Sequence, residues 1–454
     1  MTVHAFRQHH IEHPRFEHNH KGEPVKHSRK VVVATIVAAA LALALVPVAG
    51  SAGAQSSVRG VTNTEIKVEG LGYAAFYADA GKAAKARFDQ ANSSGEIPGG
   101  RKINYLGFKD DASTADTNLQ QGRAMVDQDG VFAAVPVITP FLQAGSYFQQ
   151  QKVPTIGWGI SAAYCDSSLT FIFGFTGCLV PPGNPPKYAG NTWGELINKQ
   201  LQAQGKGGAK GKTAAVIADN NDSGKSGVQV ISATAEAVGM KVVYAQATTP
   251  PPPATVTDYS PYVQALMTSN GGQPPDVIFL VVAQSNVLGL GRALAQAGFK
   301  GIQTNAVSYA PQLTSLANGW SAFTQFATPE STNANMQQIV TKLHAAGIQD
   351  IGQAALGGYF SADMFVQALK KVGKNLTPDA MQKVLSRITY GIDGVIGPTY
   401  YPAGYTEGTP CGQLATSNGT AWTVTAPFGC YDLLTQKNGK WKTIPYTKLT
   451  GAVR

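Results

Sequence analysis

The chain has 454 residues, of which 43% are hydrophobic and 14% charged, and 36 Lys and Arg against 27 Asp and Glu give a formal net charge of +9. The basic residues are scattered, without runs and without interleaved aromatic residues, which argues against a nucleic-acid partner. The length exceeds one ordinary core and suffices for two lobes of typical size.

The first 54 residues have the composition of a signal peptide. Residues 1–30 are polar and basic, residues 31–48 are apolar, and Ala52 and Ala54 have the spacing that a signal peptidase recognises. We predict cleavage near Ala54 and export of the remaining 400 residues. An uncleaved membrane anchor is the alternative, because the apolar run is just about long enough to span a bilayer. The run is not followed by a cysteine, which argues against a lipoprotein anchor.

Seven of the eight histidines lie within residues 1–30, at irregular spacing, and only His344 lies outside them. We interpret the seven as part of a solvated tail rather than as a metal site. With one histidine left after cleavage, neither histidine-based zinc chemistry nor a His-dependent catalytic triad is expected. The sequence predicts no metal and no cofactor.

From Glu65 onward, short β-rich runs alternate with segments of helical periodicity. The predicted strands are 65–71, 102–108, 131–136, 213–219, 241–246, 277–282 and 301–306. The predicted helices between them are 80–91, 114–129, 193–204, 224–238, 259–269 and 287–297. This alternation is typical of right-handed βαβ units and of mostly parallel sheets, so we predict an α/β fold.

The alternating pattern occurs twice along the chain. The first set ends near the proline-rich residues 181–186, and the second begins with the helix at 193–204. Three further helices are predicted at 333–346, 354–372 and 377–388. The last sixty or so residues are rich in Gly, Thr and Tyr and are predicted to form strands and loops.

Four cysteines follow the apolar segment: Cys165, Cys178, Cys411 and Cys430. An even number in an exported chain indicates disulfides, although four cysteines allow three pairings. Pairing of nearest neighbours, Cys165 with Cys178 and Cys411 with Cys430, would close two short loops. Each disulfide would stabilise the fold by about 3 kcal/mol. A zinc site made of the four thiolates is the less favoured alternative, because none of the spacings is CxxC.

Nucleotide and catalytic motifs are incomplete. Residues 211–213 and 224–226 resemble the end of a phosphate loop, but Lys206 and Asp219 occupy the positions of the required earlier glycine. Residues 289–294 contain two glycines of a dinucleotide fingerprint inside a helical pattern, which favours close helix packing. We found no GxSxG motif, and no Ser or Cys has a histidine available as base. These features favour a binding protein over an enzyme.

The pair Asp110–Asp111 ends a predicted strand and precedes a predicted helix. We expect one of the two carboxylates to cap that helix rather than to act in catalysis.

The order of these segments resembles that of the type 1 periplasmic binding proteins, specifically the receptors of branched-chain amino acid ABC transporters. The resemblance spans nearly all of the exported part and rests on residues 70–80, 105–112, 153–157 and 215–219, taken in order. It implies two Rossmann-like lobes in a Venus-flytrap arrangement, joined by three crossovers. Residues 62–186 and 329–390 would form lobe 1, and residues 187–328 and 391–454 would form lobe 2.

The resemblance also implies a ligand site at the carboxyl ends of the strands, where open parallel sheets bind ligands. Thr139 and Ser161 would donate hydroxyl groups and Gly159 a backbone amide to a ligand carboxylate. The remaining predicted ligand-binding residues are Tyr73, Phe76 and Tyr77 as an aromatic wall, with Trp158, Ser223, Gln284 and Tyr309. The alternative is that Trp158 belongs to the core and that Thr139 and Ser161 only cap helices.

One departure from the family changes the expected ligand. Amino-acid receptors have an acidic residue for the ligand's ammonium group, but the corresponding residues 304–309 contain neither Asp nor Glu. A buried ammonium without a counter-charge is costly. An aromatic or aliphatic acid, an amide or a small polyol is therefore a credible ligand.

The predicted function is an extracytoplasmic, non-enzymatic receptor that delivers its ligand to the permease subunits of an ABC transporter, and we expect a monomer. A ligand sensor that signals to a membrane receptor is the first alternative. A secreted hydrolase is the second, and the missing nucleophile and base argue against it.

Overall fold

The computed structural model describes residues 58–160, 162–165, 167–174, 188–252, 254–402 and 408–445. The predicted signal peptide, Ser161 and Cys178 lie outside these ranges. Residues 55–454 form a unit separate from residues 1–54, and the description below concerns that unit.

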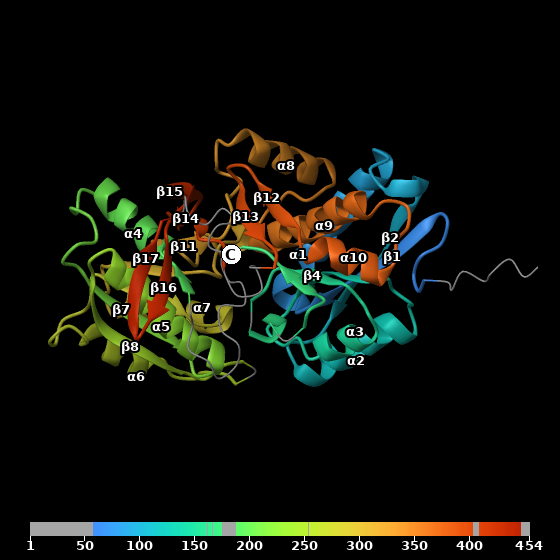
Figure 1. Ribbon diagram of the computed structural model, residues 1–454. Helices are drawn as coiled ribbons and strands as arrows, with labels where there is room; N and C mark the ends of the chain where they lie inside the picture. The colour runs from blue at the N-terminus through green and yellow to red at the C-terminus, as the bar shows by residue number, and fades with distance from the viewer. Residues whose placement is uncertain are drawn as a thin grey trace, which may run out of the picture. The chain divides into compact units, whose positions relative to one another are not determined.

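The first sheet has five parallel strands in the order β2-β1-β3-β4-β5. These are β1 (Glu65–Gly72), β2 (Lys102–Asp110), β3 (Ala133–Ile138), β4 (Thr155–Gly157) and β5 (Thr170–Ile172). The helices of this part are α1 (Ala74–Ser93), α2 (Ala115–Asp127), α3 (Gly145–Gln150), α8 (Ala334–Ala345), α9 (Gln353–Val372) and α10 (Pro378–Leu385), with the short η1 (Pro98–Gly100) and η2 (Ala162–Cys165). Helices α1 and α9 lie side by side against the first sheet (Figure 1).

The second sheet has seven strands in the order β15-β14-β11-β10-β9-β7-β8. The parallel strands are β7 (Thr213–Asp219), β8 (Lys241–Thr249), β9 (Val277–Val281), β10 (Ile302–Asn305) and β11 (Trp320–Thr324). The antiparallel strands β14 (Cys411–Ser417) and β15 (Trp422–Cys430) extend its edge. The helices here are α4 (Thr192–Ala203), α5 (Asp222–Ala237), α6 (Ser260–Met267) and α7 (Gln284–Gln296), with the short η3 (Pro311–Leu313).

Two small sheets complete the described part. The hairpin of β12 (Thr389–Ile392) and β13 (Ile396–Tyr400) packs on the first sheet's core through Tyr390 and Ile396. The other small sheet joins β6 (Tyr188–Gly190), β16 (Leu433–Lys437) and β17 (Lys440–Ile444). Its residues Ala189 and Leu434 belong to a core of the second sheet.

The predicted α/β fold with parallel sheets is confirmed, and each sheet has hydrophobic clusters of its own. The predicted strands and helices agree with the observed ones, although the ends differ by several residues and α1 begins six residues earlier. Strands β4, β5 and β11 had no prediction, because two of them have only three residues and none shows a distinctive alternation.

The expectation for Asp110–Asp111 was wrong, because Thr114 caps α2 by accepting a hydrogen bond from the backbone N–H of Thr117. Asp110 instead accepts a hydrogen bond from the N–H of Ala74, at the start of α1. The aspartate therefore connects the carboxyl end of β2 to the neighbouring helix.

The predicted pairing of Cys411 with Cys430 is confirmed. The two residues lie opposite each other in the β14–β15 ladder, so the bridge fastens an existing strand pair. The disulfide also excludes these two thiolates as zinc ligands. The other predicted pair involves Cys178, which lies outside the described residues.

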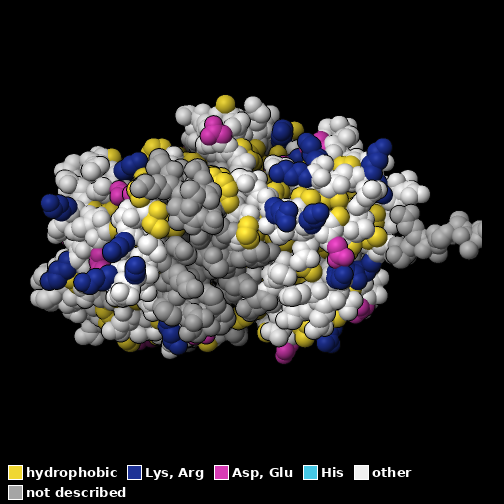
Figure 2. All heavy atoms as spheres, in the orientation of Figure 1, with side chains coloured by type: hydrophobic (Ala, Val, Ile, Leu, Met, Phe, Trp, Pro, Cys, Tyr) yellow, Lys and Arg dark blue, Asp and Glu magenta, His cyan; other side chains and the backbone are white. Residues whose placement is uncertain are grey.

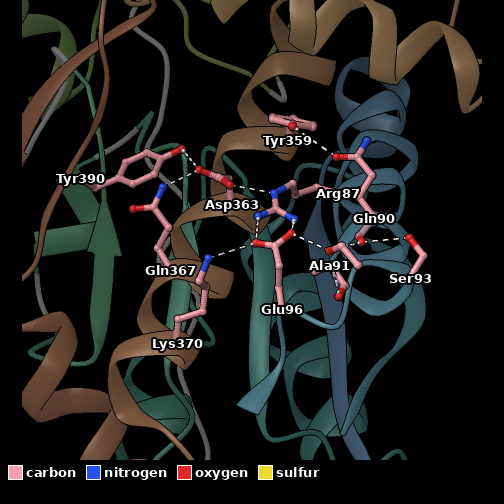
Figure 3. A network of polar contacts seen from close by, with 11 residues as sticks. Arg87, Gln90, Ala91, Ser93, Glu96, Tyr359, Asp363, Gln367, Lys370 and Tyr390 are labelled. Atoms are coloured by element: carbon pink, nitrogen blue, oxygen red, sulfur yellow. Dashed lines mark hydrogen bonds and ion pairs between the residues drawn. The ribbon is translucent and has the colours of Figure 1, made fainter. Parts of the chain in front are cut away.

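Helices α1 and α9 are joined by buried charged groups (Figure 3). Arg87 donates from Nε to Asp363 Oδ1 over 2.7 Å and from its two terminal nitrogens to both oxygens of Glu96, over 3.1 and 3.0 Å. Gln367 and Tyr390 donate to the second oxygen of Asp363. The network therefore connects α1, the turn after it, α9 and β12.

The face drawn in Figure 2 shows Lys and Arg side chains dispersed over the surface, with Asp and Glu side chains among them. None of the helices within the described ranges is both long and apolar enough to cross a membrane.

Candidate functional site

A cavity of about 670 Å³ lies where strands of both parallel sheets end. This volume is within the range that small-molecule sites occupy. Both sheets change their strand order at this place, between β1 and β3 and between β7 and β9, and such switch points hold the ligand in open α/β sheets. The lining residues come from strand ends and the loops after them in both sheets, and from helices α1, α4, α5 and α7.

The wall provided by the first sheet is aromatic. The cavity is lined here by Tyr73, Phe76 and Tyr77 at the start of α1 and by Trp158 after β4. All four were named from the sequence as ligand-binding residues. Tyr73 and Phe76 pack edge to face with ring centroids 5.1 Å apart, and Tyr77 packs edge to face against Trp158 at 6.5 Å. Burial raises the pKa of the Tyr77 phenol to about 12, so this side chain remains neutral at physiological pH. Phe141 adds another ring.

Trp158 also contacts the segment by which the chain leaves the second sheet. Its indole Nε1 donates a hydrogen bond of 3.1 Å to Gln325 Oε1, one residue after the end of β11, and its ring packs against Phe326. Since Gln325 lines the cavity as well, a ligand that touches Trp158 also lies next to this connecting segment.

Thr139 and Gly159 are not among the residues that line the cavity. Thr139 is fully buried. Its hydroxyl donates to the carboxylate of Asp111 and its N–H donates to Tyr164 Oη. The loops that contain Thr139 and Gly159 reach the cavity through Pro140 and Ile160 instead.

Helix α5 and strand β9 provide much of the second sheet's wall. Asn221 caps α5 by accepting from the N–H of Gly224. Beyond this cap the cavity follows α5 to Val230 and Ile231, whose side chains are 4% and 3% exposed. Leu280 of β9 also lines the cavity, so much of this wall is apolar.

Asp219 is the one charged residue among the described residues that line the cavity. Its Oδ1 accepts hydrogen bonds of 2.8 Å from both Thr249 Oγ1 and Asn286 Nδ2, and its Oδ2 accepts one of 2.7 Å from the N–H of Ala283. Burial raises the pKa of this carboxyl above its usual value, although the three donors act against that rise. The carboxylate therefore positions the start of α7 with both of its oxygens.

The amino end of α7 faces the cavity with Ala283, Gln284 and Ser285. This end has no side-chain cap and no acidic residue in its first turn. The carboxylate of Asp219 already accepts the N–H of Ala283 at this end, and the helix dipole favours a further acceptor group there.

The remaining predicted residues are divided between the cavity and the core. Ser223 and Gln284 line the cavity, and Gln284 Nε2 donates to the carbonyl of Val307. Tyr309 is only 1% exposed and is not a lining residue. Its hydroxyl donates to the carboxylate of Glu330, over 2.8 Å to the nearer oxygen.

Sequence reasoning missed the apolar residues of α5 and β9 and also Asp219. The signal available for Asp219 was its place as the last residue of a predicted strand, since strand ends of a parallel sheet meet at the ligand crevice. Val230 and Ile231 follow the pattern of ordinary core residues in an amphipathic helix, so the sequence does not indicate that they also line a cavity.

Comparisons with known proteins identify the family of the chain and relate its fold to solved structures. The model of the family described as periplasmic binding protein matches residues 71–420. A comparison with curated protein sequences found no significant match.

Three solved structures illustrate the similarity in fold. A possible leucine/isoleucine/valine-binding protein from Rhodopirellula baltica is 14% identical, with a TM-score of 0.62 over 82% of this chain and 98% of that one. A fatty acid ABC transporter substrate-binding protein from Thermomonospora curvata is 18% identical, with a TM-score of 0.61 over 82% and 94%. A solute-binding protein from R. palustris in complex with 4-hydroxybenzoate is 17% identical, with a TM-score of 0.60 over 84% and 96%.

The family match covers most of the chain, and the three structures are covered over nearly their whole length. The resemblance to the type 1 periplasmic binding proteins inferred from the sequence is therefore confirmed. This chain belongs to the periplasmic binding protein family.

Proposed function

We propose that this protein is an extracytoplasmic receptor that binds a small, largely apolar molecule without an ammonium group and delivers it to an ABC transporter permease. The observation that carries the proposal is the 670 Å³ cavity, which is lined by Tyr73, Tyr77 and Trp158 on the side of the first sheet and by Val230 and Ile231 on the side of the second. Each methylene group buried against such walls contributes about 0.8 kcal/mol. An apolar ligand therefore gains most of its affinity from the surface it buries.

The hydrogen-bonding groups around the cavity favour a ligand without an ammonium group over an amino acid. The carboxylate of Asp219 already accepts hydrogen bonds from Ala283, Thr249 and Asn286. An ammonium group would have to compete with these donors for Asp219, which makes its burial costly. An acceptor oxygen of the ligand, in contrast, matches the amino end of α7, which has no side-chain cap from its own N-cap residue.

A ligand that binds between the two sheets touches a wall from each of them, so its binding can change how the two lobes are arranged. An open and a closed arrangement of the two lobes would exchange, and a ligand that touches both walls would stabilise the closed one. The closed form would then dock on the permease. A sensor that passes the same closure to a membrane receptor remains the alternative.

The first test is a thermal-shift screen of residues 55–454 with aromatic and aliphatic acids, amides, polyols and amino acids. A ligand at a hundred times its dissociation constant stabilises by about 2.7 kcal/mol, which moves the midpoint measurably. The proposal expects hits among acids or amides that lack an ammonium group. Hits restricted to leucine-like amino acids would contradict it, and Asp219→Asn would then be expected to abolish them.

Two variants show whether a hit occupies the cavity. Phe76→Ala removes a lining ring that is 38% exposed, and Leu106→Ala removes a comparably exposed side chain, 39%, that is not a lining residue. Phe76→Ala is expected to weaken the hit about tenfold. Leu106→Ala should leave the affinity unchanged, and equal effects of the two variants would place the ligand elsewhere.

A further inference from the structure

The cavity continues beyond the strand ends into the core of the second sheet. Trp193, Ile231 and Phe323 line it, and all three belong to the hydrophobic cluster packed against that sheet. Their side chains are 1–3% exposed. The rings of Trp193 and Phe323 stack with centroids 5.0 Å apart. A ligand that reaches this end touches side chains of the protein core.

The path to this end runs along one face of α5. Ser223, Gly227 and Ile231 are spaced four residues apart, so they share a face of the helix, and all three line the cavity. Ser223 is exposed, Gly227 is half-buried and Ile231 is buried. The cavity therefore passes from the surface into the core over two turns of helix.

The length of this path limits what it can hold. Eight residues of α-helix rise about 12 Å, which matches an extended acyl chain of about eight to ten carbon atoms. Gly227 allows α5 to pack closely on β9, because a Cβ atom there would lie 2.7 Å from Cγ1 of Val281. Among the described residues, no charged side chain other than Asp219 lines the cavity, so an uncharged chain is the component that fits.

We propose that the ligand carries a straight acyl chain, which lies along α5 with its end against Trp193, Ile231 and Phe323. This inference rests on the proposed function and specifies the ligand class for the same site. The polar head of the ligand remains near the strand ends, where the amino end of α7 lies.

The test is calorimetric titration of residues 55–454 with straight-chain carboxylates of four to fourteen carbons. Affinity is expected to rise about fourfold with each added methylene group and to stop rising at about eight to ten carbons. The affinity for primary alcohols of the same lengths should rise by the same factor per methylene group. It should differ from the affinity for the acids by a constant factor, since only the head group changes.

Two substitutions of Ile231 are expected to change the preferred chain length of the ligand in opposite directions. Ile231→Ala lengthens the space and should shift the optimum to longer chains, while Ile231→Phe shortens it and should shift the optimum to shorter ones. Leu201→Ala is the control, because Leu201 is buried in the same cluster but is not a lining residue. It should lower the melting temperature without moving the optimum. If either Ile231 variant fails to fold, the other one still gives the direction.

The possible failures have different meanings. If short acids bind but affinity is flat with chain length, or if the Ile231 variants keep the wild-type optimum, the acyl-chain inference is overturned and the proposed function stands. If acids and alcohols of every length fail to bind while leucine binds, both are overturned.

Discussion

Glu69 illustrates how one buried acid sets the pH dependence of stability. Lys109 Nζ lies 3.3 Å from Glu69 Oε1 and 3.1 Å from Asp129 Oδ2. Burial nevertheless raises the pKa of Glu69 from 4.5 to about 7, and the charge of Lys109 offsets only part of that rise. The folded protein thus binds this proton more tightly than the unfolded chain does. The contribution of Glu69 to stability is present below pH 4.5 and is lost as the pH rises through about 7.

Replacement of Glu69 by Gln removes this titration. Raising the pH from 5 to 8 is expected to lower the free energy of unfolding of the wild type by about 1 to 3 kcal/mol more than that of the variant. Urea unfolding at the two pH values measures the difference. Glu65→Gln, in a less buried position at the start of the same strand, is the control. A pH dependence equal to the wild type's would show that Glu69 is not the titrating group.

Single residues of the site were predictable only in part. Tyr73, Phe76, Tyr77 and Trp158 were placed at strand ends by the family resemblance, and the structure brings them together around the cavity. The prediction for Thr139 rested on the same resemblance, but its hydroxyl is bonded to Asp111, 28 residues away in the sequence. Contacts of that range are set by tertiary packing, so residue patterns do not reveal them. The ligand roles of these residues remain predictions.

At the scale of elements, the Arg87 network fastens α9 to α1. These two helices are far apart in the sequence but lie side by side (Figure 1). Arg87 is 7% exposed, and it pairs with both Asp363 and Glu96. A buried charge that loses its partner is strongly destabilising. The helix pair therefore depends on this arginine.

Arg87→Met is expected to lower the free energy of unfolding by about 3 to 5 kcal/mol, because it leaves Asp363 buried without its main partner. Lys85→Met, two residues earlier on the same helix, removes an exposed ion pair with Asp89 and should cost less than about 1 kcal/mol. Equilibrium urea unfolding gives both values. Similar costs for the two variants would mean that the buried network does not hold the helices together.

Elements were more predictable than single contacts, because hydrophobic periodicity is a local property of the chain. Strand β7 was predicted with its observed ends, and α9 was predicted to within one residue. Strand β11 was missed since WSAFT shows no clear alternation, although the turn dipeptide Asn318–Gly319 precedes it. The network between Arg87 and Asp363 joins residues 276 positions apart and leaves no local trace.

At the scale of the whole molecule, the order of strands and helices predicted the α/β class, and the place of the ligand site remains a prediction. Strands of both sheets end at one cavity, which is the kind of place where open parallel sheets bind ligands. The depth of the cavity was not predictable, because it depends on how α5 packs on β9. The lobe boundaries also remain a prediction.

The central claim, that two lobes close on an apolar ligand, is tested most directly by small-angle X-ray scattering of residues 55–454 with and without saturating decanoate. We predict a smaller radius of gyration with the ligand, and no change with leucine at the same concentration. Saturation by decanoate without any decrease in the radius of gyration would contradict closure. A decrease with leucine alone would contradict the proposed ligand class.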